Sequence, residues 1–168
     1  SDGIKDVVIS KCDFIENRES IRGSAVFYEK EGVESKVVID SSNFIRNKID
    51  GSSDGVIVCF NFIDVPHDVM KFSNCKFNNF LSGGNNSTIF SFADHGNAEY
   101  VNCEINSNTK ATFFFLFDSD SISFKNSLLK GDTINFGARI RGVSYFKNVN
   151  MLNMSLEVGE SNFNNSIF

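Results

Sequence analysis

A six-residue phrase recurs along the chain and restricts its fold more than any other feature. Each copy opens on a large apolar residue, carries a small residue three positions later, and closes on a second large apolar residue. The copies span 9–14, 39–44, 72–77, 100–105, 124–129 and 146–151. Their spacing falls within the range of roughly 20 to 50 residues that is typical of repeat architectures, so the phrase predicts a solenoid or an array of stacked units.

The positions of the apolar residues predict a bend inside the phrase. In the third copy Cys75 and Phe77 are two residues apart and share one face of a strand, whereas Phe72 is an odd number of residues from both. The residue before the small position is Asn in the last four copies, and it is Lys11 and Ser41 in the first two. Because Asn is the non-Gly residue that best tolerates the left-handed conformation, we predict one left-handed residue at this position. Such a residue would turn both apolar sets towards one interior.

A further apolar segment follows the phrase after a loop of variable length. These segments are expected at 25–28, 56–60, 88–92, 113–117 and 133–136. Three short strands per unit without a helix between them are typical of a parallel β-helix. A β-propeller has a longer repeat, of about 40 to 45 residues per blade, and leucine-rich repeats need a Leu-dominated pattern. We therefore predict an all-β parallel solenoid of about six coils of three short strands each.

Stacking the coils about 4.8 Å apart would turn equivalent positions into columns. We expect Phe14, Phe44 and Phe77 to form one aromatic stack, and the aligned Asn residues to form an amide ladder at the bend. Three of the four Cys occupy the small position of the phrase, where other copies carry Ser or Val. We interpret them as free thiols in a packed column rather than as disulfides, and the absence of a Cys-x-x-Cys pair argues against a metal site.

Charge and hydropathy exclude two classes of partner. The net charge is −5, and Lys and Arg are scattered singly, so we expect no nucleic-acid groove. The longest apolar run, Phe113 to Phe117, is far shorter than the roughly 20 residues that span a bilayer, so we expect no membrane insertion in this segment. Because repeat-like sequence begins almost at once, we interpret residues 1–168 as a single segment of a longer protein, with neighbouring β-helix coils of that chain as partners.

Two copies of the phrase extend into a second motif. Residues 12–17 and 42–47 both contain Phe-x-x-Asn, and Gly23-Ser24-Ala25-Val26 follows the first of them. They resemble the Phe-x-x-Asn repeats, followed by a Gly-Gly-Ala-Ile-like strand, of polymorphic outer-membrane-protein-like surface proteins. The resemblance covers most of the chain as a rhythm and about the first third as a motif. It implies a right-handed, pectin-lyase-like parallel β-helix on a cell surface with an adhesive role, although enzymes share that fold.

The best catalytic or metal constellation would lie at the ends of the third strands. The residues concerned are Glu29, Asn61, Asp64, Asp94 and Asp118, with His95 and Asp120 nearby. Paired carboxylates serve as acid and base in glycan hydrolysis, or hold calcium in elimination. We interpret these acids instead as strand-terminating turns, because they scatter over four coils without a matching Lys or Arg cluster. The sequence therefore assigns no catalytic, cofactor or metal residue.

Three smaller features have a plain interpretation. His67 fits a solvated loop, and Arg139 and Arg141 fit a charged strand that faces water better than an anion contact. Sequons begin at Asn85, Asn86, Asn153 and Asn164. They permit N-glycosylation if the protein is eukaryotic and secreted.

Strong repetition beside poor clustering of reactive groups favours a non-enzymatic segment of a surface or secreted protein, located outside the cell. It would act as an adhesin-like stalk or interaction scaffold that contacts a protein or glycan surface through loops 48–55, 62–68 and 82–87. Two alternatives stay open. One is a carbohydrate-active enzyme, a glycan hydrolase or lyase, that uses Asp94 and Asp118. The other is an intracellular scaffold repeat in a large assembly.

Overall fold

The computed structural model describes most of the chain as short parallel strands. The described residues are 6–19, 25–31, 36–49, 58–63, 69–78, 81–82, 88–93, 97–106, 112–116, 121–131, 137–140 and 143–167. Within these ranges every regular element is a strand, and every strand pair is parallel. No helix in the described part is long and apolar enough to cross a membrane. The predicted all-β stack of parallel strands is confirmed.

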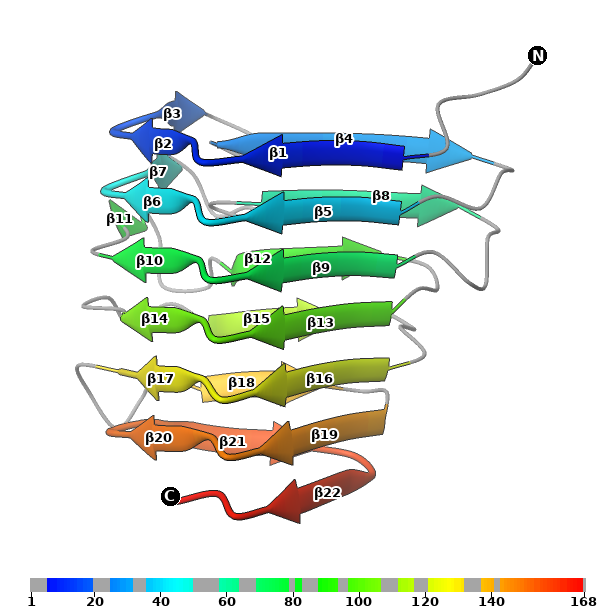
Figure 1. The fold of residues 1–168 in the computed structure, drawn as a ribbon, viewed down its shortest axis with the longest axis vertical. Helices are drawn as coiled ribbons and strands as arrows, with labels where there is room; N and C mark the ends of the chain where they lie inside the picture. The colour runs from blue at the N-terminus through cyan, green and yellow to red at the C-terminus, as the bar shows by residue number, and fades with distance from the viewer. Residues whose placement is uncertain are drawn as a thin grey trace.

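The strand before the bend builds one sheet, which we call the long sheet. Its seven strands are β1 (Asp6–Ser10), β5 (Lys36–Asp40), β9 (Val69–Ser73), β13 (Asn97–Val101), β16 (Ser121–Lys125), β19 (Val143–Lys147) and β22 (Ser161–Asn164). They pair in sequence order without a register shift, so Ile9 lies beside Ile39, and Ile39 beside Phe72. Figure 1 shows them stacked from the N-terminus at the top to the C-terminus at the bottom.

The strand after the bend builds the corner sheet. Its six strands are β2 (Asp13–Ile15), β6 (Asn43–Ile45), β10 (Lys76–Asn78), β14 (Glu104–Asn106), β17 (Leu128–Lys130) and β20 (Asn150–Leu152). The third strand builds the back sheet, which runs in the opposite direction behind the long sheet (Figure 1). Its six strands are β4 (Val26–Glu31), β8 (Val58–Ile63), β12 (Thr88–Ala93), β15 (Thr112–Leu116), β18 (Gly137–Ile140) and β21 (Ser155–Val158).

The third strand of each unit lies only partly where the sequence predicts it. The first four predicted segments overlap β4, β8, β12 and β15. The fifth, 133–136, lies outside the described residues, and the strand that pairs with β15 is β18, where Phe114 lies beside Ala138. A fourth strand, which the three-strand unit omits, occurs at β3 (Arg18–Glu19), β7 (Lys48–Ile49) and β11 (Leu81–Ser82). For these repeats the prediction of three strands was therefore incomplete.

The interior consists of columns of equivalent side chains. Phe44 stacks between Phe14 and Phe77, with ring centroids 4.7 Å apart on both sides, which confirms the predicted aromatic stack. A second column begins at Phe72, and its rings are 4.9 to 5.4 Å apart through Tyr100, Phe124, Phe146 and Phe163. These separations suit favourable ring contacts, and each fully buried ring contributes roughly 1.5 to 3 kcal/mol. The columns therefore hold one repeat on the next.

Candidate functional site

The bend inside the phrase is the most regular feature of the described surface. The residue before the small position has φ between 50° and 54° in all six copies, including Lys11 and Ser41, which confirms the predicted left-handed bend. Asn165 has φ 48° at the equivalent place after β22, so the C-terminal stretch continues the pattern. At each bend the backbone N–H still pairs across repeats: Asn102 donates to the Lys125 carbonyl at 2.9 Å.

The aligned amides form the predicted ladder along this bend. The Asn102 Nδ2 donates to Asn74 Oδ1 at 3.1 Å, and Asn126 and Asn148 repeat the contact at 3.3 and 2.9 Å. All four side chains are exposed. An amide has two N–H donors and an acceptor with two lone pairs. Because the ladder uses one donor and one acceptor site of Asn102 and of Asn126, each amide retains hydrogen-bonding capacity for a ligand.

Asp40 begins the ladder where the first two copies lack Asn. Its Oδ1 accepts hydrogen bonds from the Ser73 hydroxyl at 2.7 Å and from Asn74 Nδ2 at 3.0 Å, and its Oδ2 accepts one from Ser41 at 2.9 Å. These bonds, that from Ser73 first, lower the pKa of Asp40 because they stabilise the carboxylate. The negative charge therefore lies at one end of a row of neutral amides.

The small position stabilises the bend from inside. Ser42 and Ser127 each donate to the carbonyl two residues earlier at 2.9 Å. Each also accepts the backbone N–H of the preceding repeat's small residue, Cys12 or Cys103, at 3.1 Å. A side chain that only filled space would make neither bond. The predicted small filler therefore also satisfies backbone groups that the bend removes from the strand ladder.

The cysteines of this column are free thiols, as predicted. Cys12 is partly buried, and Cys75 and Cys103 are buried. A hydrogen bond with Cys75 and burial both raise the pKa of the Cys103 thiol. Burial raises the pKa of Tyr100 as well. A raised pKa keeps the Cys103 thiol protonated and unreactive. The same hydrogen bond lowers the pKa of Cys75, but the Cys75 side chain is fully buried, so both thiols are suited to packing.

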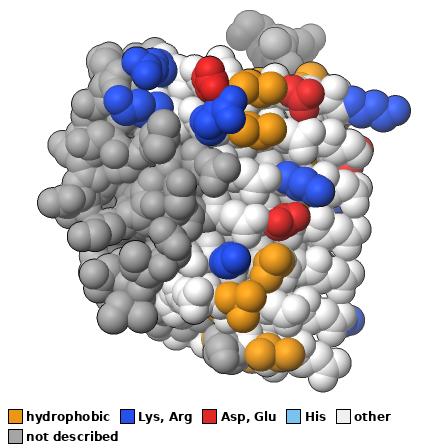
Figure 2. Space-filling model, turned by 90° about the vertical axis from the view of Figure 1, so that its left-hand side faces the viewer, with side chains coloured by type: hydrophobic (Ala, Val, Ile, Leu, Met, Phe, Trp, Pro, Cys, Tyr) orange, Lys and Arg blue, Asp and Glu red, His pale blue; other side chains and the backbone are white. Residues whose placement is uncertain are grey.

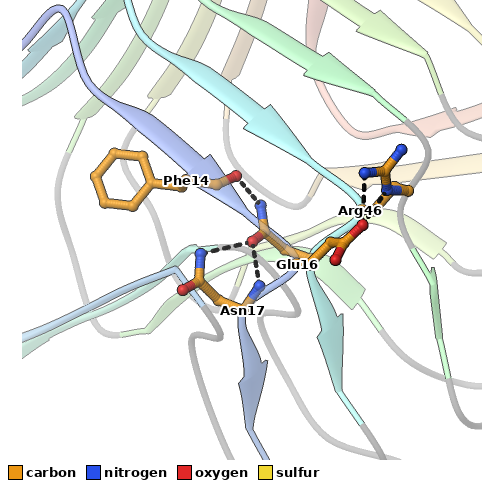
Figure 3. Close-up of polar contacts among 5 residues, drawn as sticks. Phe14, Glu16, Asn17 and Arg46 are labelled. Atoms are coloured by element: carbon orange, nitrogen blue, oxygen red, sulfur yellow. Dashed lines mark hydrogen bonds and ion pairs between the residues drawn. The ribbon is translucent and has the colours of Figure 1, made fainter.

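A second bend follows the corner strand in the first two repeats and again after β20, where Asn153 has φ 54°, and the sequence did not indicate it. Glu16 and Arg46 have φ of 55° and 52° there, and they pair across repeats at 2.7 Å. Each is followed by the Asn of the Phe-x-x-Asn motif, Asn17 or Asn47. Asn47 Oδ1 accepts hydrogen bonds from the Asn17 backbone N–H and side-chain amide at 3.1 and 2.9 Å. Asn47 Nδ2 donates to the Phe14 carbonyl at 3.0 Å, so the motif Asn links two repeats; Figure 3 labels Asn17 and Phe14, where these contacts end.

A groove of about 520 Å³ runs beside the amide ladder. One wall consists of the four ladder amides, and the other consists of outward side chains of the corner sheet: Lys76, Glu104, Leu128 and Asn150. Lys76 and Glu104 are 4.0 Å apart. Figure 2 shows this side of the molecule, with charged side chains between two groups of exposed hydrophobic ones. The groove therefore offers amide dipoles and one ion pair, which suit polar contact with a ligand.

The acidic constellation at the third strands is placed only in part. The backbones of Glu29 and Asn61 lie side by side in β4 and β8. Asp64, Asp94, Asp118, His95 and Asp120 lie outside the described residues, as do His67 and Arg141. Arg139 lies in β18, beside Glu157 of β21 in the backbone register. Among the described residues, no group of three or more His, Cys, Asp or Glu could hold a metal ion.

The sequons are also placed only in part. Asn153 and Asn164 have exposed side chains, whereas Asn85 and Asn86 lie outside the described residues. Comparison with known proteins adds nothing to these assignments, because no family model, curated protein or solved structure matches the chain.

Proposed function

We propose that this chain is a non-enzymatic, right-handed parallel β-helix segment of about six coils with three principal strands each. It acts as an adhesin-like stalk or interaction scaffold of a surface or secreted protein. The observation that supports this most is the continuity of the inter-repeat contacts: aromatic columns inside and amide ladders at the bend both pass from repeat to repeat. Such contacts make a stack stiff and leave its outer faces and loops to vary.

Two further observations support the fold part of this proposal. The strands of the long sheet, the corner sheet and the back sheet recur in the same order along the chain. In Figure 1 the chain runs leftward in front and rightward behind while it descends, which is the path of a right-handed coil. The partner would be a protein or a glycan, contacted through the loops at 48–55, 62–68 and 82–87. Of these only 48–49, 62–63 and 82 are described.

An attachment assay tests this role. The chain is immobilised on beads, and its attachment to cells and to surfaces coated with protein or glycan is compared with that of three variants. In each variant one of the three loops is replaced by a Gly-Ser linker of equal length. We expect attachment that falls when a contact loop is replaced, and no release of sugar from any glycan. Turnover of a glycan by the wild-type chain, or no attachment to any surface, would overturn the proposal.

The free thiols favour a second candidate, an intracellular scaffold repeat within a large assembly. Cys12, Cys75 and Cys103 form no disulfide in the described part of the structure, and cysteines without disulfides are the rule in reducing compartments. Labelling the thiols of the protein from its native source after denaturation, with and without reductant, separates the two candidates. Full labelling without reductant supports the intracellular scaffold, and labelling only after reduction supports the secreted stalk.

A further inference from the structure

A second groove, of about 610 Å³, opens on the outer face of the long sheet. It lies across β13, β16, β19 and β22, on the side that faces the viewer in Figure 1. Ser123 of β16 lies in register between Glu99 of β13 and Tyr145 of β19. Successive outward side chains of a strand stand two residues apart, so Ser121 lies on the same face. Two small residues between longer ones explain why the sheet is hollowed here.

Two lysines that border this groove form no ion pair among the described residues. Lys125 and Lys147 are in register on adjacent strands, and both side chains are exposed. Like charges directly opposite each other on neighbouring strands are destabilising. Glu99, which also lines the groove, has its carboxylate 3.7 Å from the Lys71 ammonium, and Lys76 of the corner sheet lies 4.0 Å from Glu104. No such pair occurs for Lys125 or Lys147 among the described residues, in a chain whose net charge is −5. Their positive charge is therefore available to an anionic ligand.

Neutral groups around the lysines complete a surface suited to sugars. The side chain of Tyr145 is 46 % exposed although it lies in mid-strand. Asn162 is in register beside Tyr145, and Asn164 is in register beside Lys147. Amides and hydroxyls can donate and accept hydrogen bonds with sugar hydroxyls, and an exposed aromatic ring provides an apolar face for a ring to lie on.

We propose that this groove binds an acidic oligosaccharide. Its carboxylate or sulfate groups pair with Lys125 and Lys147, and a sugar ring lies against Tyr145. A peptide fits less well, because extended peptides bind by adding to a free strand edge. Here β13, β16 and β19 are each paired on both sides, so their backbone groups are already used. The inference rests on the proposed display role, since it names the class of partner that one outer face would contact.

Calorimetric titration with defined oligosaccharides tests the site. The probes are a galacturonic acid oligomer, a heparin oligomer and an uncharged glucose oligomer, each at low and at moderate salt. We expect binding of at least one acidic oligomer, weakening with salt, and no binding of the uncharged one. Lys125→Gln with Lys147→Gln should reduce affinity at least about tenfold, because the double variant removes both positive charges that pair with the acidic groups. Tyr145→Ala should weaken binding as well.

Lys130→Gln is the matched control, because Lys130 is an exposed lysine on β17 of the corner sheet, outside the groove. Its affinity should equal that of the wild type. The proposal is overturned if neither acidic oligomer binds, if the control weakens binding as much as the double variant, or if a polyglutamate peptide binds as tightly as the sugars. Attachment through the loops would persist in each of these cases, whereas failure of the display role would appear as no attachment by a chain that still binds the oligomer.

Discussion

Replacing Asn102 by Val separates the two roles of the bend residue. Its backbone has φ 54°, and its exposed amide donates to Asn74 and accepts from Asn126. A non-Gly residue in the left-handed region costs about 1 to 2 kcal/mol, and Val, being β-branched, lacks the local hydrogen bonding that makes Asn tolerant. Loss of the amide contacts adds roughly 0.5 kcal/mol, since water replaces them at an exposed site. We therefore expect Asn102→Val to lower the free energy of unfolding by about 2 kcal/mol.

Two further variants separate the cost of the left-handed backbone from the loss of the amide contacts. Asn102→Gly removes the same amide but accepts a positive φ, so we expect it to cost at most about 1 kcal/mol, mostly as entropy of the unfolded chain. Lys125→Val, in the strand whose carbonyl receives the Asn102 N–H, introduces Val at an exposed strand position and should be nearly neutral. Urea unfolding at equilibrium measures all three, with the slope checked for constancy because repeat proteins do not always unfold in one step. If Asn102→Gly lowers the free energy of unfolding as much as Asn102→Val does, or if Asn102→Val leaves it unchanged, the bend argument is wrong.

Three further predictions follow from the columns and the ladder. Phe44→Ala opens a gap between two stacked rings and should lower the free energy of unfolding by about 3 to 5 kcal/mol. Phe14→Ala should lower it by less, because Phe14 is only half-buried. Urea midpoints that rank the two variants the other way would contradict the stack. Hydrogen bonds lower the pKa of Asp40, so its stabilising contribution is present above the ordinary carboxyl pKa of about 4 and is lost as pH falls through the lower folded value. Asp40→Asn should therefore lose less stability than the wild type as the pH falls from 5 to 2, as measured by thermal unfolding of both proteins at each pH. If the two proteins lose the same stability over this range, Asp40 does not have this role. Cys75 and Cys103 should resist alkylation in the folded protein and react on unfolding, as mapped by mass spectrometry of digests, whereas rapid native labelling of Cys103 would contradict its burial and its raised pKa.

The bend and the columns were predictable because they leave a parity signal in the sequence. A left-handed residue was inferred even at Lys11 and Ser41, which have no marked preference for it, since the apolar residues on either side demanded a turn. The stack of Phe14, Phe44 and Phe77 followed from the same alignment. Periodic burial thus specifies the corner more firmly than the propensity of any one residue.

Other features left no comparable signal. Glu16 and Arg46 bend the chain with residue types that do not favour the left-handed region, and the strands that follow are only two residues long. The back-sheet strand β18 has the sequence Gly-Ala-Arg-Ile, a weaker strand pattern than the Thr-Ile-Asn-Phe before it, so pairing with β15 and not local propensity decides its position. The lysine pair, by contrast, did leave a signal: Lys125 and Lys147 both hold the second position of their copies of the phrase, and the register brings equivalent positions together.

The in-register stack itself can be measured with pairs of spin labels. Ser10, Lys125 and Asn164 are exposed and belong to one column of the long sheet, on strands β1, β16 and β22. Labels are attached in a cysteine-free background that carries serine at positions 12, 75 and 103, as other repeats do, and also at position 59. With a strand spacing of about 4.8 Å, the backbones at Ser10 and Asn164 should be about 29 Å apart and those at Ser10 and Lys125 about 19 Å apart. Pulsed EPR distances in this ratio would support the account, and distances that follow separation in the sequence instead of strand number would contradict it.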